Sequence, residues 1–203
     1  MKRVLFLLPL VMLLFCACTK QPDTEILLKT YIHYPKISGY PRFNNAIEEK
    51  VDAIIANYRP NEHEDSVTYV SVRKDGVFSI AFFGEVMASG AAHPAKVYEC
   101  GSFNMKTGEV IPLSSLTEID DKFLADFTRL ANEQLAKLEK PVKLNKIYTK
   151  EELKKELEKS DKAEKYYVNT TCSYSTGDGL AIRLWVPHVY GDYIEVRMPE
   201  TEI

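Results

Sequence analysis

The sequence is poor in the residues that most often carry chemistry: it has four cysteines, four histidines and one tryptophan. The histidines are scattered, none forms an HExxH motif, and no pair of cysteines has zinc-finger spacing. There is no GxSxG elbow for a nucleophilic serine. No glycine-rich loop leads into a helix that carries a lysine, as phosphate-binding loops do. We therefore predict no catalytic residue, no metal site and no cofactor.

An excess of positive charge is also missing. The chain has 26 basic and 29 acidic residues, a net charge of −3. Residues 1–17 carry two of the basic residues and no acidic one, so residues 18–203 have 24 basic against 29 acidic residues, a net charge of −5. Because nucleic-acid binding needs clustered Lys and Arg to neutralise phosphates, this balance argues against a nucleic-acid partner. It suits a basic protein partner.

Long hydrophobic runs are absent except at the N-terminus, where residues 4–15 follow a basic start. This run is short for a bilayer-spanning helix and is typical of a secretory signal. It ends at Ala17-Cys18, which resembles a bacterial lipobox. We expect residues 1–17 to be a lipoprotein signal peptide, Cys18 to be lipidated, and residues 18–24 to tether the fold to the extracytoplasmic face of a bacterial membrane in the cell envelope. The alternative is a secreted or N-terminally anchored protein without lipid.

Two further cysteines, Cys100 and Cys172, fall in predicted strands. In an oxidising compartment two remaining cysteines often pair. A disulfide between them is one interpretation, and two buried thiols that behave as small hydrophobic residues is the other.

Hydrophobic periodicity predicts one α+β domain over residues 25–203. Predicted strands cover residues 25–34, 67–74, 77–87, 95–105, 109–113, 166–173, 180–186 and 193–198, and predicted helices cover about 42–58, 121–139 and 150–162. Capping boxes at 115–118 and 149–152 precede the second and third helices. In the first helix, charged residues including Lys50 are expected on the exposed face. The order of elements predicts an antiparallel sheet, a meander plus a C-terminal hairpin, with two to three helices packed on one face.

Two groups of residues are candidates for function. His93 follows a small-residue break and precedes Pro94, which restricts it to extended conformations; it either orients the strand entry or serves as a ligand. The C-terminal segment carries aromatic and loop residues that suit contact with a protein or a glycan. These candidate contact residues are Trp185, Pro187, Tyr190 and Tyr193. The alternative is that they cover a half-buried sheet face.

Several blocks of the sequence resemble one bacterial family. The blocks are 34–39 ahead of the amphipathic helix, Gly90-Ala91-Ala92-His93-Pro94, 103–108 with Thr107-Gly108, 179–180, 185–187 and 195–199. Together they resemble the extracytoplasmic domain of anti-sigma-V factors, which also occurs beside peptidoglycan deacetylase domains, a domain of unknown function of the 3298/4163 type. The resemblance spans about residues 26–199, and its motif residues here are Gly90, His93, Pro94, Thr107 and Gly108. Ala91 and the loop 187–192 differ from the family pattern.

The resemblance implies an α+β sensing or wall-associated module that is not an enzyme. In the anti-sigma-V members this domain recognises lysozyme, and binding exposes the protein to proteolysis. We therefore hypothesise a lipid-anchored binding or sensing module that recognises a lysozyme-like protein or a cell-wall glycan. The alternatives are an envelope hydrolase or metal-dependent enzyme that uses His93, and a structural envelope lipoprotein without a ligand.

Overall fold

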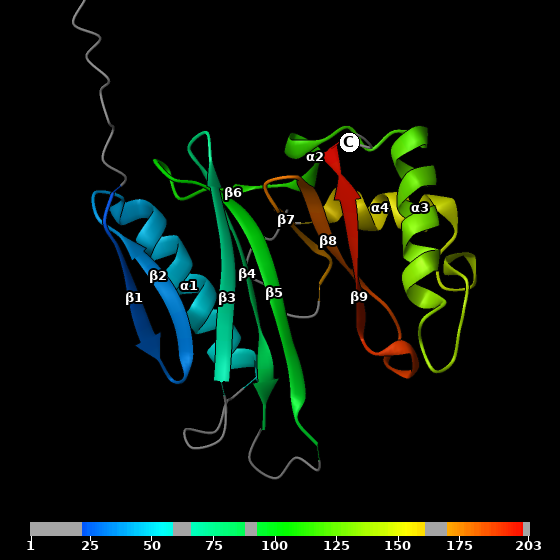
Figure 1. Ribbon diagram of the computed structural model, residues 1–203, viewed down its shortest axis with the longest axis horizontal. Coiled ribbons are helices and arrows are strands. Elements are labelled where there is room, and N and C mark those ends of the chain that lie inside the picture. Colours follow the sequence, from blue (N-terminus) through cyan, green and yellow to red (C-terminus); the bar gives the residue numbers. More distant parts are fainter. Residues whose placement is uncertain (1–21, 59–65, 88–92, 161–169, 201–203) are drawn as a thin grey trace, which may run out of the picture.

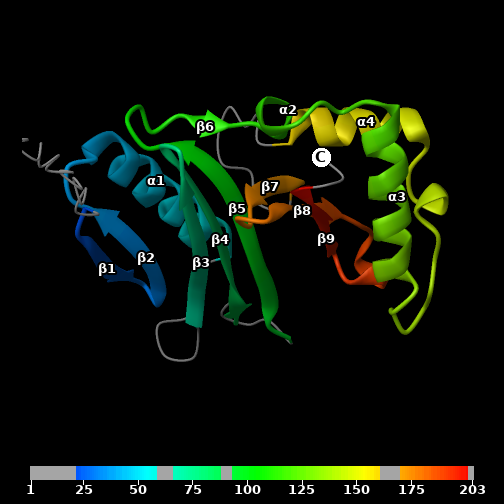
Figure 2. The same cartoon turned by 45° about the horizontal axis from the view of Figure 1, so that its top comes forward.

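The computed structural model describes residues 22–58, 66–87, 93–160 and 170–200. These residues form two β-sheets that meet near the middle of the molecule, with helices on the outer side of each sheet (Figure 1). The α+β class predicted from the sequence is confirmed. The helices, however, are divided between two sheets, because each sheet has an apolar face that needs its own cover (Figure 2).

The first sheet has six strands, which follow chain order from one edge to the other. They are β1 (Thr24–Lys29), β2 (Ile32–Ile37), β3 (Ser66–Lys74), β4 (Val77–Val86), β5 (Ala95–Asn104) and β6 (Val110–Ile111). Neighbours are antiparallel except β2 and β3, which are parallel through one bridge from Ile32 to Val67. The helix between β2 and β3 returns the chain to the same end of the sheet, as a parallel pair requires.

The N-terminal strand differs from the prediction, because the segment 25–34 is a hairpin and not one strand. Its two-residue turn falls on Thr30 and Tyr31, with φ of 47° and 67°. Such turns usually carry Asn or Gly, so the sequence held no signal for this one. β2 continues through Pro35, which faces Ile26. That position forms no hydrogen bond between the two strands and so needs no N–H from proline.

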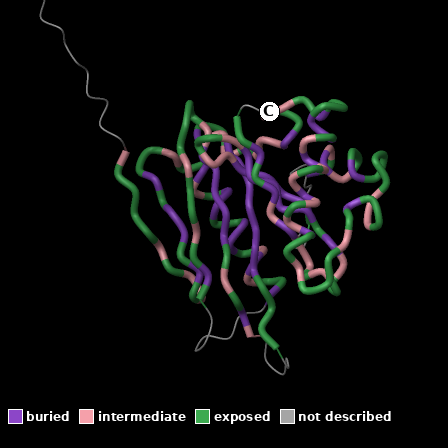
Figure 3. The backbone as a smooth tube through the Cα atoms, turned by 45° about the vertical axis from the view of Figure 1, so that its right-hand side comes forward, coloured by how far each residue is buried: buried purple, intermediate pink, exposed green. Residues whose placement is uncertain are grey.

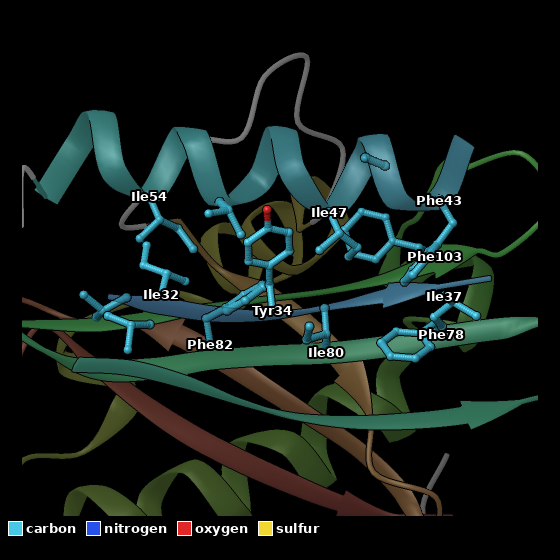
Figure 4. Close-up of a cluster of buried hydrophobic side chains, with 14 of the residues drawn as sticks. Ile32, Tyr34, Ile37, Phe43, Ile47, Ile54, Phe78, Ile80, Phe82 and Phe103 are labelled. Carbon is cyan, nitrogen blue, oxygen red and sulfur yellow. The ribbon is translucent and has the colours of Figure 1, made fainter. Parts of the chain in front are cut away.

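Helix α1 (Pro41–Tyr58) covers one face of the first sheet. Its apolar side chains point into a single layer between helix and strands, as Figure 4 shows. Phe43 packs against Phe78 with ring centroids 4.8 Å apart and meets the edge of Phe103 at 6.3 Å. The amphipathic stripe predicted over 42–58 is the surface that builds this core.

The second sheet is antiparallel and carries the remaining helices. It consists of β7 (Cys172–Ser175), β8 (Gly179–Trp185) and β9 (Tyr193–Pro199); the helical segments are α2 (Leu113–Leu116), α3 (Asp121–Leu135), η1 (Leu144–Lys146), α4 (Lys150–Lys159) and η2 (His188–Tyr190). Alternate residues of β8, Leu180, Ile182 and Leu184, are buried against the apolar faces of α3 and α4. None of the helices in the described ranges is long and apolar enough to cross a membrane.

The helix starts show one correct and one wrong cap prediction. The capping box of Thr149 and Glu152 opens α4. The predicted box at 115–118 opens no helix, because those residues lie in α2 and just after it. Helix α3 instead has Asp120 as its N-cap, and the side chain of Asp120 accepts a hydrogen bond of 2.7 Å from the backbone N–H of Phe123.

The two sheets meet through small and aromatic side chains. Ala81, Tyr98 and Cys100 of the first sheet form one buried cluster with Cys172, Tyr174 and Ala181 of the second. A disulfide joins Cys100 in β5 to Cys172 in β7, with Cα atoms 5.7 Å apart. This cross-link ties the N-terminal half of the chain to the C-terminal half.

Candidate functional site

The β8–β9 hairpin presents two of the aromatic residues that the sequence singled out. Trp185 and Tyr193 lie directly opposite each other in the antiparallel register. Successive residues of a strand point to opposite faces, so these two share one face while Leu184 and Ile194 are buried on the other, towards α3. Trp185 keeps 39% of its surface exposed and Tyr193 is half-buried. We call Trp185 and Tyr193 the aromatic pair.

The aromatic pair is held from two sides. The ring of Tyr193 lies 5.1 Å from that of Tyr98 in β5, and the guanidinium of Arg183 lies 4.8 Å from the Tyr193 ring, within cation–π range. On the other side the Tyr148 hydroxyl donates a 2.9 Å hydrogen bond to the carbonyl of Trp185. Burial, followed by nearby carboxylates, raises the pKa of Tyr148 to about 12, so it remains a donor at neutral pH. The Tyr193 ring and the backbone of Trp185 are therefore held in place.

The loop 187–192 turns away from the aromatic pair. Pro187 is half-buried and precedes η2, a single turn of 3₁₀ helix. Tyr190 packs against the core of the second sheet and α3, so it does not join the pair. Val189, which the sequence analysis did not select, is exposed at the tip. Of the four predicted contact residues, the structure therefore brings only the aromatic pair together on one face.

Carboxylates surround Tyr193. Burial raises the pKa of its hydroxyl most; Arg183 lowers it, and the negative charges of Glu195, Asp192 and Glu85 raise it further. Glu195 also accepts a hydrogen bond from the Tyr98 hydroxyl. Glu195 is paired with Arg197 at 2.6 Å, and Arg183 lies over the Tyr193 ring, so charges of both signs surround the pair.

Behind the aromatic pair, Arg183 reaches into a buried ionic cluster. Its Nη1 lies 3.3 Å from Glu99 Oε1, Lys50 Nζ lies 3.8 Å from Glu99 Oε2, and the Tyr58 hydroxyl donates a 3.4 Å hydrogen bond to Glu99. Lys50, Glu99 and Arg183 are only 6%, 2% and 1% exposed. Burial, and then the charge of Glu99, raises the pKa of Tyr58 above its usual range. The cluster fixes β8 against β5 and α1.

This cluster was not predicted from the sequence. Lys50 was expected on the exposed face of the first helix, which is wrong: its side chain is buried under α1 beside Glu99. The available signal was the strand period, since Glu99 alternates with Val97 and so occupies the face of β5 that packs against α1; the other face of β5 is buried as well, against the second sheet. A charged residue in such a place needs a partner, but the period does not say which one.

The residues of the family motif lie at opposite ends of β5. His93 and Pro94 enter the strand and are exposed, whereas Thr107 and Gly108 lie beyond its other end. The ten residues of β5 span about 33 Å, so the structure does not bring these residues together. Gly90 lies outside the described residues, as do Cys18 and the leader. In the described part of the chain, no group of three or more His, Cys, Asp or Glu side chains is placed to hold a metal ion.

Thr107 and Gly108 build a turn that supports α1. The Asn104 side chain accepts hydrogen bonds from the backbone N–H groups of Lys106 and Thr107, which folds the turn back on itself. Gly108 has φ of 75°, and a Cβ there would lie 2.5 Å from the carbonyl oxygen of Arg42 at the start of α1. Only glycine allows this close approach.

Replacing Gly108 with alanine is therefore expected to destabilise the fold by about 3 kcal/mol, the sum of a left-handed backbone and a steric clash. Gly39→Ala is the matched control, because Gly39 has φ of 84° with no atom within 4 Å of a Cβ, and its loss should be about 1 kcal/mol. Urea unfolding of both variants measures the difference. Equal losses would show that the Arg42 backbone moves aside freely.

Comparison with known proteins gives a likeness of fold. No family model matches the chain, and no curated protein matches it. Among solved structures it is similar to a DUF3298 family protein from Pseudomonas aeruginosa PAO1, with 13% identity, 89% of this chain and 92% of that chain covered, and a TM-score of 0.50. A member of the same family from Bacteroides fragilis NCTC 9343 aligns with 11% identity, coverage of 89% and 88%, and a TM-score of 0.41. The likeness to the Pseudomonas protein shows that this chain has a fold of the DUF3298 type.

Proposed function

We propose that this protein is an extracytoplasmic binding module that holds a basic protein ligand on the aromatic pair. The observation that carries the proposal is the exposure of Trp185, which lies opposite Tyr193 on a strand hairpin. Aromatic residues of this kind often dominate the binding energy of protein interfaces. The Tyr193 ring and the Trp185 backbone are held before binding, which limits the conformational entropy that is lost when a ligand arrives.

Net charge supports a basic ligand, because residues 18–203 carry a net charge of −5. Near Tyr193, the carboxylates of Glu85 and Asp192 lie alongside the cation Arg183. A lysozyme-like enzyme is the specific candidate, since the sequence resemblance implies lysozyme recognition. Long-range attraction between opposite charges raises the association rate and makes it dependent on salt. The N-terminal leader and Cys18 support the proposal that the module is held at a membrane by lipid.

The test is calorimetric titration of the purified protein with a basic egg-white-type lysozyme at low and high salt. Trp185→Ala should weaken binding at least about 30-fold, the loss of about 2 kcal/mol that marks a hot spot. Tyr31→Asn is the matched control, because Tyr31 is an aromatic residue with 38% exposure in the β1–β2 turn, remote from the pair, and asparagine tolerates its positive φ. Its binding should equal that of the unchanged protein.

The same titration separates the other functions. No heat with lysozyme at either salt concentration would overturn the basic protein ligand, and soluble peptidoglycan fragments would then test a glycan on the same pair. Binding that survives Trp185→Ala would place the contact elsewhere. The hydrolase alternative built on His93 has no comparable support, since that exposed side chain makes no hydrogen bond or ion pair within the described ranges.

A further inference from the structure

The outer edge of β1 is the second notable surface of the molecule, and it lies apart from the aromatic pair. β1 ends the six-stranded sheet, and no other strand of the described residues pairs with its free side. Most of the strand is exposed, whereas the central strands are buried (Figure 3). A free strand edge is a template for pairing with another chain.

The register shows which backbone groups the edge offers. Lys29 and Ile32 flank the two-residue turn and form a hydrogen-bonded pair. Along the rest of the hairpin, non-hydrogen-bonded and hydrogen-bonded pairs alternate. The N–H and C=O groups of Thr24, Ile26 and Leu28 therefore point away from β2. By this alternation, Thr24 and Ile37 form a pair without hydrogen bonds to each other. Consistent with this, the Ile37 N–H donates to the side chain of Asn44, and the Ile37 carbonyl accepts a hydrogen bond from it.

The edge lacks several of the features that usually block such pairing. β1 contains no proline, glycine or bulge and pairs without interruption over all six residues, and its charged residues are Glu25 and Lys29. Ile26 and Leu28 expose 64% and 59% of their surfaces on the face away from α1. An uncovered edge strand with exposed apolar side chains is a site where another chain can pair.

The pattern of β1 is complementary to itself. In an antiparallel pair of two copies centred on Leu27, Ile26 of one copy faces Leu28 of the other as a hydrogen-bonded pair, and the two Leu27 residues face each other. In the same register Glu25 faces Lys29, so opposite charges meet at both ends. From this geometry we infer that two copies of the chain associate through antiparallel pairing of β1, which forms one continuous twelve-stranded sheet.

The surroundings of β1 accommodate a second strand. On the α1 side, a pocket of about 440 Å³ adjoins the strand, and Leu27, Tyr34, Asn45 and Glu48 contribute to its lining. The Leu27 side chain of a second copy would lie on this side of the sheet, next to the first Leu27. Lys29 is already held at this edge by Asp52 at 2.6 Å and Glu48 at 3.3 Å.

The first test is the mass of the purified full chain in detergent, measured by light scattering over a concentration series. We expect twice the protein mass of one chain. Ile26→Pro removes an N–H that points to the free edge and bonds nothing in β2, so this variant should have the mass of one chain. Ile26→Thr keeps the N–H and should retain the pair at higher concentration. Circular dichroism checks that both variants fold.

The second test fixes the register. In the proposed dimer the two copies of residue 27 form a non-hydrogen-bonded antiparallel pair, with Cα atoms about 4.5 Å apart. Leu27→Cys therefore places two thiols within disulfide range. Mild oxidation should give a reducible dimer on denaturing gels. Ile26→Cys is the first control, because in this register the two copies of residue 26 are diagonal neighbours and too far apart for easy disulfide formation. Val70→Cys is the second control, because it puts an exposed thiol on an interior strand. Both controls should stay largely monomeric.

Three results would overturn the inference. If the protein has the mass of one chain at every concentration, self-association is rejected, and the edge of β1 would instead bind another protein or a lipid surface. A dimer that persists in Ile26→Pro would place the contact elsewhere. Cross-linking of Leu27→Cys no faster than Val70→Cys would reject the register centred on Leu27.

Discussion

Glu99→Gln is expected to destabilise the protein by about 3 to 5 kcal/mol. The carboxylate of Glu99 lies between the buried cations Lys50 and Arg183, and its removal takes away the negative charge that offsets their mutual repulsion in a site of low dielectric constant. Glutamine keeps the shape of the side chain, so the loss reports charge and not volume. Urea unfolding at neutral pH, fitted with a common m-value, measures the change in free energy of unfolding.

An exposed ion pair supplies the control for this prediction. Glu133 lies 3.2 Å from Arg129 on the outer surface of α3, and Glu133→Gln should change stability by less than about 1 kcal/mol. Replacing Lys50, Glu99 and Arg183 together with Met, Leu and Met should recover much of the loss, because apolar residues of similar volume need no charge partner. If Glu99→Gln were as mild as Glu133→Gln, water would have to reach the cluster.

Replacing Cys100 and Cys172 together with alanine is expected to destabilise the protein by about 4 kcal/mol. The disulfide closes a loop with a sequence separation of 72, and opening it restores chain entropy to the unfolded state. The midpoint of urea unfolding under non-reducing conditions measures the loss.

A reducing agent provides the internal control for the disulfide. It should lower the stability of the unchanged protein towards that of the double variant and leave the variant itself unaffected. If the oxidised protein and the double variant unfolded at the same urea concentration, the bond would not contribute to stability.

The elements that local periodicity specifies were predictable. The apolar stripe of α1 and the alternation in β8 each depend on residues within one segment, and each defines a core face. The same alternation placed Trp185 opposite the apolar face of its strand. The capping box of Thr149 and Glu152 is equally local.

Local sequence signals failed to predict the β1–β2 turn, because residues that rarely adopt positive φ occupy it. The β1–β2 turn places Thr30 and Tyr31 at positive φ, which sequence statistics assign to Asn and Gly. The prediction therefore joined two strands into one and hid the free edge of β1. Helix α3 takes its cap from Asp120, while a better-looking capping box upstream opens no helix.

By itself the sequence determined the α+β class and the core faces of the helices and strands, because these properties depend on spacing along one segment. Only the tertiary structure decided which distant residues meet. It joined Lys50, Glu99 and Arg183 in one buried cluster, paired Cys100 with Cys172, and separated His93 from Gly108 by the length of β5. Contacts of this kind depend on how two sheets pack, and no periodicity within a segment encodes them.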